Sequence, residues 1–464
     1  MSMFNPANRR RAANMLRLAG PIILTRAGWM FMSFVDVFMV GRYSTAELAY
    51  LSLASSLISV AYVAMMGMML GTLVITSNLF GQRRYSQLGA VWRRSLPYAF
   101  ALGVAVLLLT FFAEPLLIAT GQDAALARES ARVIQIYGYG MPLGGLVYVT
   151  SQYFLEGIKR PLPAMVLMLV ANIINVGLNW VLVYGHFGFD AMGAAGSAWA
   201  TTIIRMFLTA GIVFYIWRMP GARLMGVRKP YTGGFAAWSE QRRLGYAAGV
   251  SFGIEHVSFV MLFIFAGLLS TLDLAAVTIV FNTFALFFMV SAGLASATAV
   301  QVGIAWGRRD AGEIKAAGWT GIVLMVFILF IPTLLMIFSP AMLASIYTED
   351  EALVRLAVPL YFLGGFSLLL DTAQTLWSNA LRGRHDKWFP TASHFVSYVV
   401  LMVPLAWYLA FPLGHGSAGL FESLIVASIL SVAVLTGRFV FLSRQDHAAG
   451  VWPAIEPPRE RHLR

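Results

Sequence analysis

Residues 41–49 read GRYSTAELA and residues 267–275 read GLLSTLDLA, so one pattern occurs twice at an offset of 226 residues (267 − 41). Two further matches lie at the same offset without gaps. They pair FGQR at 80–83 with WGRR at 306–309, and Gly157 with Gly383. Three ungapped matches at one spacing are hard to obtain by chance, so the sequence predicts two related halves.

Each half contains six apolar segments that are long enough to cross a bilayer, which needs about 20 apolar residues per helix. They lie near residues 15–40, 50–80, 93–118, 128–157, 162–184 and 191–217, and then near 241–267, 274–305, 316–340, 350–382, 390–411 and 418–443. Because six is an even number, both halves enter the membrane from the same side. We predict an all-α integral membrane protein with twelve transmembrane helices in two six-helix parallel repeats. Such halves usually enclose a central site whose access alternates.

Composition also indicates a membrane protein. Of the 464 residues, 59% are hydrophobic and only 12% are charged, and the mean hydropathy is +0.74. Soluble domains carry about 25% charged residues. The net charge of +12 is spread between the apolar segments, so we expect anchors at the cytoplasmic membrane surface and no nucleic-acid partner. The chain has no cysteine, which excludes disulfides, thiolate metal sites and cysteine nucleophiles.

The loop charges alternate along the chain. Basic clusters such as Arg83-Arg84, Arg308-Arg309 and Arg382-Gly-Arg384 follow every second apolar segment, whereas the remaining loops are neutral or acidic, as at 349–351. Positive loops face the cytoplasm. We therefore predict a multi-pass protein of the cell (inner or plasma) membrane with both termini in the cytoplasm. The predicted parts are the first half at 1–217, a cytoplasmic linker at 218–243, the second half at 244–443 and a cytoplasmic tail at 444–464.

Ionisable residues inside apolar segments are the candidates for function, because a charge in the bilayer centre is costly. Three are acids: Asp36 in the first segment, Glu255 in the seventh and Asp371 in the tenth. Each acid has two possible roles: a structural hydrogen bond or ion pair inside the bundle, or a proton or cation site that faces a cavity. A dry environment disfavours the charged form of an unpaired carboxylate, so such a group can load and release a proton as access alternates.

The other polar candidates are more ambiguous. Arg26 and Arg205 could bind a ligand, or they could snorkel or neutralise an acid. His256 follows Glu255 but points about 100° away on a helix, and His394 has the features of a packing histidine. Asn175 and Asn179 share one helix face, which suits either a site or interhelical hydrogen bonds.

The sequence lacks the common motifs of nucleotide binding and of zinc proteases. It has no Walker A pattern, no His-Glu-x-x-His and no dinucleotide fingerprint. We therefore expect transport driven by an ion gradient or by a partner, and not by ATP bound to this chain.

At this level of detail the chain resembles the NorM-like branch of the multidrug and toxic compound extrusion (MATE) family, from about Arg17 to Arg444. The resemblance rests on LAGP at 18–21, VDVFMVG at 35–41, NVGLN at 175–179, GAAGSAWAT at 193–201, and the two second-half acids. Each motif alone is moderately specific, and their order within a six-plus-six repeat is highly specific.

The resemblance implies a secondary antiporter, not an enzyme. Such a protein exports organic, often cationic and lipophilic compounds or drugs against inward Na⁺ or H⁺, uses no cofactor, and is expected to be a monomer. The family's second-half cation site maps onto Glu255 and Asp371, where Na⁺ could bind. Its first-half site maps onto Asp36, with Asn175, Asn179 and Thr201 as supporting polar groups, and Pro21 is the structural or hinge position. Some relatives carry aspartate in place of Asn179, so this chain has one charge fewer there.

Two alternatives belong to other functional classes. A lipid-linked precursor flippase of the same superfamily would line its cavity with several arginines for phosphate, but here only Arg26 and Arg205 are available against three carboxylates. A membrane-embedded enzyme would need a clustered nucleophile and base or a set of metal ligands, which the sequence does not offer.

Overall fold

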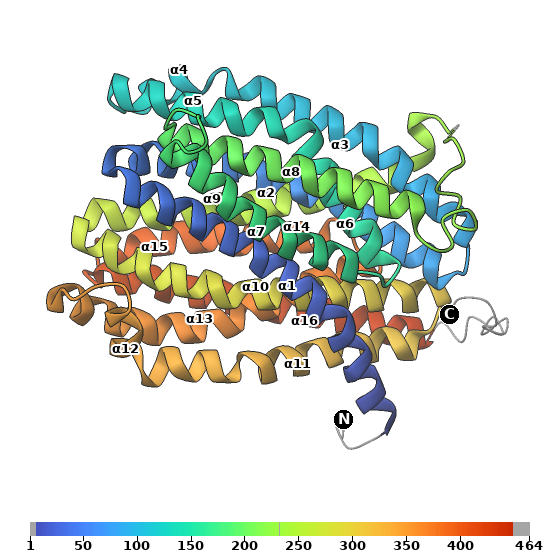
Figure 1. Cartoon of the computed structure of the whole chain (residues 1–464). Coiled ribbons are helices and arrows are strands. Elements are labelled where there is room, and N and C mark those ends of the chain that lie inside the picture. Colours follow the sequence, from blue (N-terminus) through green and yellow to red (C-terminus); the bar gives the residue numbers. More distant parts are fainter. Residues whose placement is uncertain (1–5, 232, 449–464) are drawn as a thin grey trace. The chain divides into compact units, whose positions relative to one another are not determined.

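The structure is a computed structural model that describes residues 6–231 and 233–448, with no side-chain description for residues 7, 447 and 448. Every regular element in these residues is a helix (Figure 1). In chain order they are α1 (Pro6–Tyr43), α2 (Thr45–Gly81), η1 (Tyr85–Gln87), α3 (Leu88–Thr110), α4 (Ala113–Ala119), α5 (Ala124–Gly140), η2 (Met141–Gly145), α6 (Leu146–Gly157), α7 (Leu162–Tyr184), α8 (Gly193–Arg218), η3 (Phe235–Trp238), α9 (Ser239–Leu269), α10 (Thr271–Arg308), α11 (Ala311–Phe338), α12 (Pro340–Ser345), α13 (Glu351–Gly383), α14 (Phe389–His394), η4 (Phe395–Met402), α15 (Val403–Ala410) and α16 (Gly416–Ala448).

Eleven helical segments of the described chain are long and apolar enough to cross a membrane. The twelfth predicted segment, 128–157, is divided into α5, the π-helical η2 and α6. A π turn is wider than an α turn, and Pro142 in η2 cannot donate a backbone hydrogen bond. α5, η2 and α6 follow one another without a gap, so this segment is the remaining helix. The prediction of twelve helices in two repeats is confirmed.

The described chain forms two compact units, and the chain passes from one unit to the other inside two helices, α1 and α9. Residues 6–23 and 250–448 form the C-terminal unit, and residues 24–231 with 233–249 form the N-terminal unit. The cuts in α1 and α9 lie 226 residues apart (249 − 23), which is the offset of the sequence repeat. Each unit therefore contains the beginning of the other half's first helix. Hydropathy could not predict this exchange, because it indicates where a helix runs and not where it packs.

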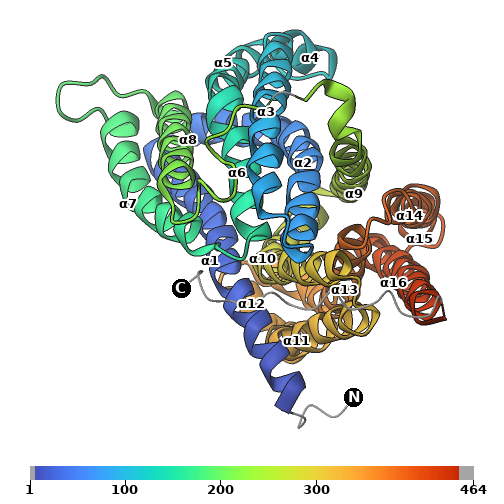
Figure 2. The same ribbon diagram turned by 90° about the vertical axis from the view of Figure 1, so that its right-hand side faces the viewer.

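In the N-terminal unit, α6 packs against α2, α3 and α8, as the view along the helices shows (Figure 2). Buried hydroxyls connect these helices: the Thr72 Oγ1 lies 3.0 Å from the Ser95 Oγ and 2.9 Å from the Thr150 Oγ1. Gln241, at the start of α9, donates to both Thr72 and Ser95. Interhelical hydrogen bonds of this kind hold membrane helices together where lipid supplies no hydrophobic drive.

In the C-terminal unit, α13 packs against α10, α11 and α16 (Figure 2). Trp377 of α13 is 2% exposed, and its ring contacts Trp319 of α11 and Phe439 of α16. The first part of α1 belongs to the same unit, where Arg11 forms a 2.9 Å ion pair with Glu313. α13 is thus the central helix of this unit, which explains why polar side chains on it are buried.

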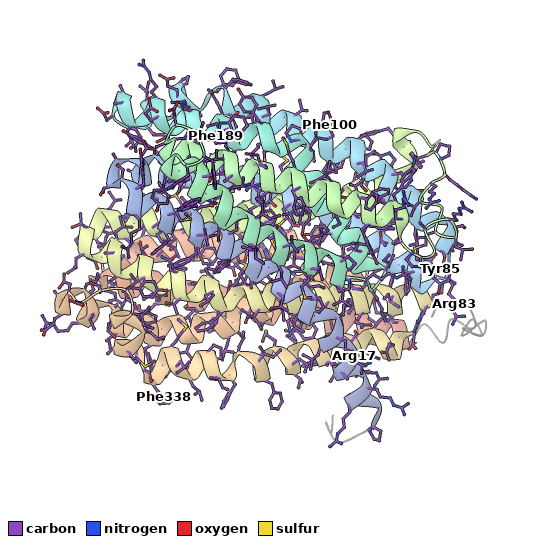
Figure 3. The ribbon with its side chains drawn as sticks, in the orientation of Figure 1. Arg17, Arg83, Tyr85, Phe100, Phe189 and Phe338 are labelled. Carbon is purple, nitrogen blue, oxygen red and sulfur yellow. The ribbon has the colours of Figure 1, made fainter. Side chains whose placement is uncertain are left out.

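Large apolar side chains cover much of the surface of each unit. Phe100 of α3 and Phe338 of α11 are 44% and 77% exposed, and they point away from their helices (Figure 3). The most apolar 18-residue stretch of α11 has a mean hydropathy of 2.8, and only a third of this stretch is buried. A helix that is apolar all round and only partly covered by protein is expected to face lipid.

The segment predicted as a linker, 218–243, is partly ordered against the N-terminal unit. Gly89 of α3 donates its backbone N–H to the carbonyl of Met225, and Arg93 donates to the carbonyl of Val227. Met225 and Val227 are buried, and α9 already begins at Ser239. Of the predicted tail 444–464, residues 449–464 lie outside the described residues.

Candidate functional site

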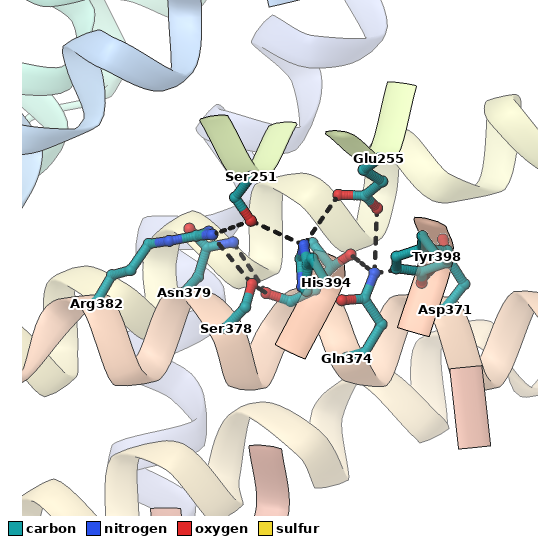
Figure 4. A network of polar contacts seen from close by, with 10 residues as sticks. Ser251, Glu255, Asp371, Gln374, Ser378, Asn379, Arg382, His394 and Tyr398 are labelled. Carbon is teal, nitrogen blue, oxygen red and sulfur yellow. Dashed lines mark hydrogen bonds and ion pairs between the residues drawn. The ribbon is translucent and has the colours of Figure 1, made fainter. Parts of the chain in front are cut away.

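The two second-half acids share a single hydrogen-bond donor. Glu255 comes from α9 and Asp371 from α13, and Gln374 lies one turn after Asp371. The Gln374 Nε2 lies 3.1 Å from the Glu255 Oε1 and 3.3 Å from the Asp371 Oδ1 (Figure 4). The Asp371 residue is 1% exposed and the Glu255 side chain is 15% exposed. The structure therefore brings Glu255 and Asp371 together, as the resemblance implied.

Asp371 also accepts a hydrogen bond from the π-helical η4. The Tyr398 hydroxyl donates to the Asp371 Oδ1 at 2.7 Å, and Tyr398 is fully buried. π turns rotate the residues that follow them and are frequent at functional sites. The ordinary helical periodicity of the 390–411 segment gave no signal for this contact.

A second chain of polar contacts leads from Glu255 to a buried arginine (Figure 4). The His394 Nδ1 lies 3.7 Å from the Glu255 Oε2 and 2.9 Å from the Ser251 Oγ. Arg382, which is 1% exposed, donates to the same Ser251 oxygen at 2.7 Å. The sequence placed Arg382 in a cytoplasmic basic cluster, whereas the structure buries it within α13.

The direction of these bonds follows from the donors. A guanidinium only donates, so the Ser251 Oγ accepts from Arg382 and can turn its own proton toward the His394 Nδ1. His394 then carries its proton on Nε2; in the other tautomer the Nδ1–H faces Ser251 and Glu255. A fixed positive charge thus lies in the polar network that contains the carboxylate pair.

The third acid, Asp36 of α1, has its own cluster in the N-terminal unit. Its Oδ1 accepts from the Asn179 Nδ2 at 2.8 Å and the Asn175 Nδ2 at 3.3 Å, and its Oδ2 accepts from the Thr201 hydroxyl at 2.7 Å. All four residues are at least 95% buried. The four residues that the resemblance assigned to a first-half site therefore lie in contact with one another.

The amide oxygens of this cluster accept no hydrogen bond from any described residue. The Oδ1 atoms of Asn175 and Asn179 are buried and without a hydrogen-bond donor among the described residues. Buried acceptors are normally satisfied, and the orientation of an amide depends on which neighbour it faces. Two unsatisfied oxygens beside a carboxylate suit a cation that none of the side chains supplies.

Arg26 and Arg205 lie in the N-terminal unit, where both are half-buried. Neither is within ion-pair distance of a carboxylate in the described part of the chain. His256 is half-buried on α9, and Pro21 lies inside α1, two residues before the cut between the units.

The sequence analysis missed Gln374, Tyr398, Ser251 and Arg382. A signal existed on α13, because Asp371, Gln374, Ser378 and Arg382 follow one another at steps of three, four and four residues. This spacing gives one polar face on a helix. His394, which the sequence indicated as a packing residue, contacts Ser251 through a hydrogen bond and lies beside Glu255. No group of three or more His, Cys, Asp or Glu side chains in the described residues could hold a metal ion.

Comparison with known proteins identifies the family. The MatE family model matches the chain twice, at residues 21–181 and 247–408. The two matches begin 226 residues apart (247 − 21), which is again the repeat offset. The chain belongs to the MatE family. The resemblance to the MATE family is thereby confirmed, and the relatives that follow confirm its NorM-like branch.

Relatives of this MatE protein match over nearly its whole length. It is 37% identical over 436 residues to a probable multidrug resistance protein NorM of Caulobacter vibrioides, covering 94% of this chain and 92% of the relative. A probable NorM of Mesorhizobium japonicum is 28% identical over 445 residues, covering 94% of both chains.

Solved structures share the fold of this MatE protein. The eukaryotic MATE transporter AtDTX14 has a TM-score of 0.87 at 19% identity, covering 95% of this chain and 98% of that one. An outward-facing multidrug resistance MATE family transporter has a TM-score of 0.82 at 16% identity, covering 94% and 97%. The chain is therefore a multi-pass membrane transporter of the MatE family and not an enzyme.

Proposed function

We propose that this MatE protein is an ion-coupled antiporter that exports organic, often cationic and lipophilic compounds, drugs included, against inward Na⁺ or H⁺. The observation that carries the proposal is the buried pair of Glu255 and Asp371, which shares the single amide of Gln374. The names of the NorM relatives support drug export.

The carboxylate pair can hold one cation at a time. Two carboxylates in a dry site resist ionising together unless a proton or another cation offsets their charge. Oxygen ligands from carboxylates and hydroxyls suit hard cations such as Na⁺, and here Asp371, Glu255 and Tyr398 supply them. A cationic substrate would compete for the same negative charge, so coupling ion and substrate would exclude each other, as antiport requires.

The Asp36 cluster supplies a second cation site on this proposal. With Asp36 ionised, the amide nitrogens of Asn175 and Asn179 donate to it. With Na⁺ in the cluster, the same amides would turn their unsatisfied oxygens toward the ion, beside the Thr201 hydroxyl. The amide flip would exchange two donors for two ligands, and it would break the hydrogen bond from the Asn179 Nδ2 to the Asn175 carbonyl.

Alternating access requires a helix that bends, and α1 offers a position. Pro21 cannot donate to the carbonyl four residues earlier, which weakens the helix at that point, and the boundary between the units falls two residues later. We assign the hinge to Pro21.

The proposal also covers the location of the protein, its partners and its oligomeric state. The protein would act in the cell (inner or plasma) membrane with both termini in the cytoplasm. Its partners would be small organic cations and the lipid bilayer, with no cofactor and no nucleic acid, and it would work as a monomer.

The experiment is ethidium export from proteoliposomes, driven separately by a pH gradient and by a Na⁺ gradient. We expect export with at least one gradient and none without, and we expect Glu255→Gln combined with Asp371→Asn to abolish it. Asp190→Asn, an exposed loop acid, is the control and should export like wild type. Export that is equally fast without any gradient, or that persists in the double variant, would reject the proposal.

A further inference from the structure

A cage of aromatic rings surrounds Arg205 in the N-terminal unit. The guanidinium carbon lies 5.7 Å from the Trp29 ring, 5.3 Å from the Tyr62 ring and 5.7 Å from the Tyr137 ring. These rings come from α1, α2 and α5. Arg205 itself is the 13th of the 26 residues of α8, so this charge lies halfway along a membrane-spanning helix.

A second arginine lies beside the same ring system. The Arg26 guanidinium carbon lies 5.6 Å from the Tyr153 ring, and its Nη1 lies 3.7 Å from the Met66 sulfur. Tyr62 is within electrostatic reach of both Arg26 and Arg205. Tyr62 therefore contacts Arg205 and also interacts electrostatically with Arg26.

Two glycines pack closely against this cluster. A Cβ on Gly144 would lie 2.7 Å from the Arg205 Cβ, and one on Gly145 would come within 3.9 Å of the Tyr62 ring. Both glycines belong to the π-helical η2. Gly144 therefore lets η2 approach α8 closely, and a larger side chain there would displace Arg205.

The acids within electrostatic reach of these arginines accept hydrogen bonds from other side chains. Asp36 is within electrostatic reach of Arg205, but both of its oxygens accept hydrogen bonds from Thr201 and the two asparagines. Glu156 is within reach of Arg26 and accepts from Gln152 at 2.7 Å. The buried Nε atoms of Arg26 and Arg205 have no hydrogen-bond acceptor in the part of the chain that the structure describes.

Arginine without an ion-pair partner at membrane depth is costly and marks a functional site. Guanidinium recognises carboxylate, sulfonate and phosphate through charge-assisted hydrogen bonds, and the rings can stack on an aromatic ligand. We propose that Arg26 and Arg205 form a binding site for the anionic group of an aromatic, amphiphilic molecule, which lies against Tyr62 and Trp29. This deepens the proposed function, on which it rests for the role of substrate, and extends it to compounds that also carry an anionic group.

The test uses a matched pair of fluorescent probes: 5-(dimethylamino)naphthalene-1-sulfonate and the neutral sulfonamide of the same ring. Binding to the full-length protein in phosphatidylcholine nanodiscs is measured by energy transfer from tryptophan. We expect the sulfonate to bind at least about tenfold more tightly than the sulfonamide. Because the readout is binding, a failure of gradient-driven export leaves this test unaffected.

Variants assign the preference to the arginines. Arg26→Met and Arg205→Met should each weaken sulfonate binding by about tenfold, with sulfonamide binding nearly unchanged. Arg128→Met, an exposed arginine of α5, is the control. Arg26→Lys and Arg205→Lys keep the charge and should keep most of the preference, which allows the test even if a methionine variant fails to fold.

A further variant, Asp36→Asn, tests the charge balance around Arg205. Asp36→Asn removes a negative charge near Arg205, so it should strengthen sulfonate binding and leave sulfonamide binding unchanged. Equal affinity of wild type for the two probes, or a preference that survives in the Arg26→Met/Arg205→Met double variant, would overturn the proposal.

A lipid headgroup could supply the same anion. If phosphatidylglycerol in the nanodiscs displaces the sulfonate from wild type, the site takes a lipid phosphate. If binding is unchanged by phosphatidylglycerol, the site takes the soluble amphiphile. Both results require the arginine-dependent preference described above.

Discussion

In the sequence repeat, Asp371 corresponds to Gly145 of the first half, and Glu255 corresponds to Trp29. Asp36 corresponds to Leu262 of the second half. The two units therefore have the same helical framework and different polar residues. In the C-terminal unit the acids share one amide, and in the N-terminal unit one acid has three donors of its own.

Asp371→Asn tests the acid of α13 directly. Asparagine keeps the size of the side chain and can still accept from Tyr398, so we expect protein abundance near wild type. It cannot take up a proton or offset a cation, so gradient-driven export should fall at least about tenfold, which corresponds to ~1.4 kcal/mol. Normal export would show that the acid is idle, and absence of the protein from the membrane would show that it is structural.

At the residue scale, the sequence identified the acids because hydropathy makes a charge in an apolar segment conspicuous. Gln374 was in the same helical face and could have been included. Tyr398 could not have been found, because η4 departs from the α-helical register that spacing arguments assume. The burial of Arg382 was not predicted, because a basic residue at a helix end is normally exposed.

At the element scale, close helix contacts depend on glycine. A Cβ on Gly245 of α9 would lie 3.0 Å from the carbonyl carbon of Met68 in α2, so Gly245→Ala should force the two helices apart. Overpacking of this kind costs about 1–3 kcal/mol. We expect a lower thermal unfolding midpoint in detergent.

Gly177→Ala is the matched control, because a Cβ on Gly177 of α7 would meet nothing within 4 Å. Alanine favours helix over glycine by about 1 kcal/mol, so this variant should unfold at the same or a higher temperature. Equal destabilisation by both substitutions would contradict the packing account.

The hinge assigned to α1 has its own test. Pro21→Ala restores a backbone donor to the helix interior and should stiffen it, so we expect slower export while dye binding is retained. Pro332→Ala, which changes a proline inside α11, is the control and should leave the rate unchanged. If both variants slow export equally, or if Pro21→Ala exports like wild type, α1 does not bend at this proline.

At the scale of the whole molecule, the repeat predicted the two halves and the apolar segments predicted the number of helices. It did not predict that the beginnings of α1 and α9 are exchanged between the compact units. This exchange depends on side-chain contacts such as those of Gln241 with Thr72 and Ser95, and such contacts have no periodic signature in the sequence.

The predicted orientation can be tested because the native chain has no cysteine. Ser86→Cys lies in a loop predicted to be cytoplasmic, and Ser345→Cys lies in one predicted to be outside; both serines are exposed. We expect an impermeant thiol reagent to label only Ser345→Cys in intact cells and both variants after lysis. Labelling of Ser86→Cys in intact cells would show that the orientation is the opposite of the predicted one.

The central claim is that the Glu255 and Asp371 pair exchanges a coupling cation for a cationic substrate. The most direct measurement is ethidium binding to purified wild type and Glu255→Gln across pH and Na⁺ concentration. In wild type we expect acid or Na⁺ to weaken ethidium binding, because a proton or Na⁺ occupies the pair. In Glu255→Gln this dependence should be reduced, and Asp36 should not restore it. An unchanged dependence on pH and Na⁺ in Glu255→Gln would contradict the claim and place the coupling chemistry at Asp36 with Asn175 and Asn179.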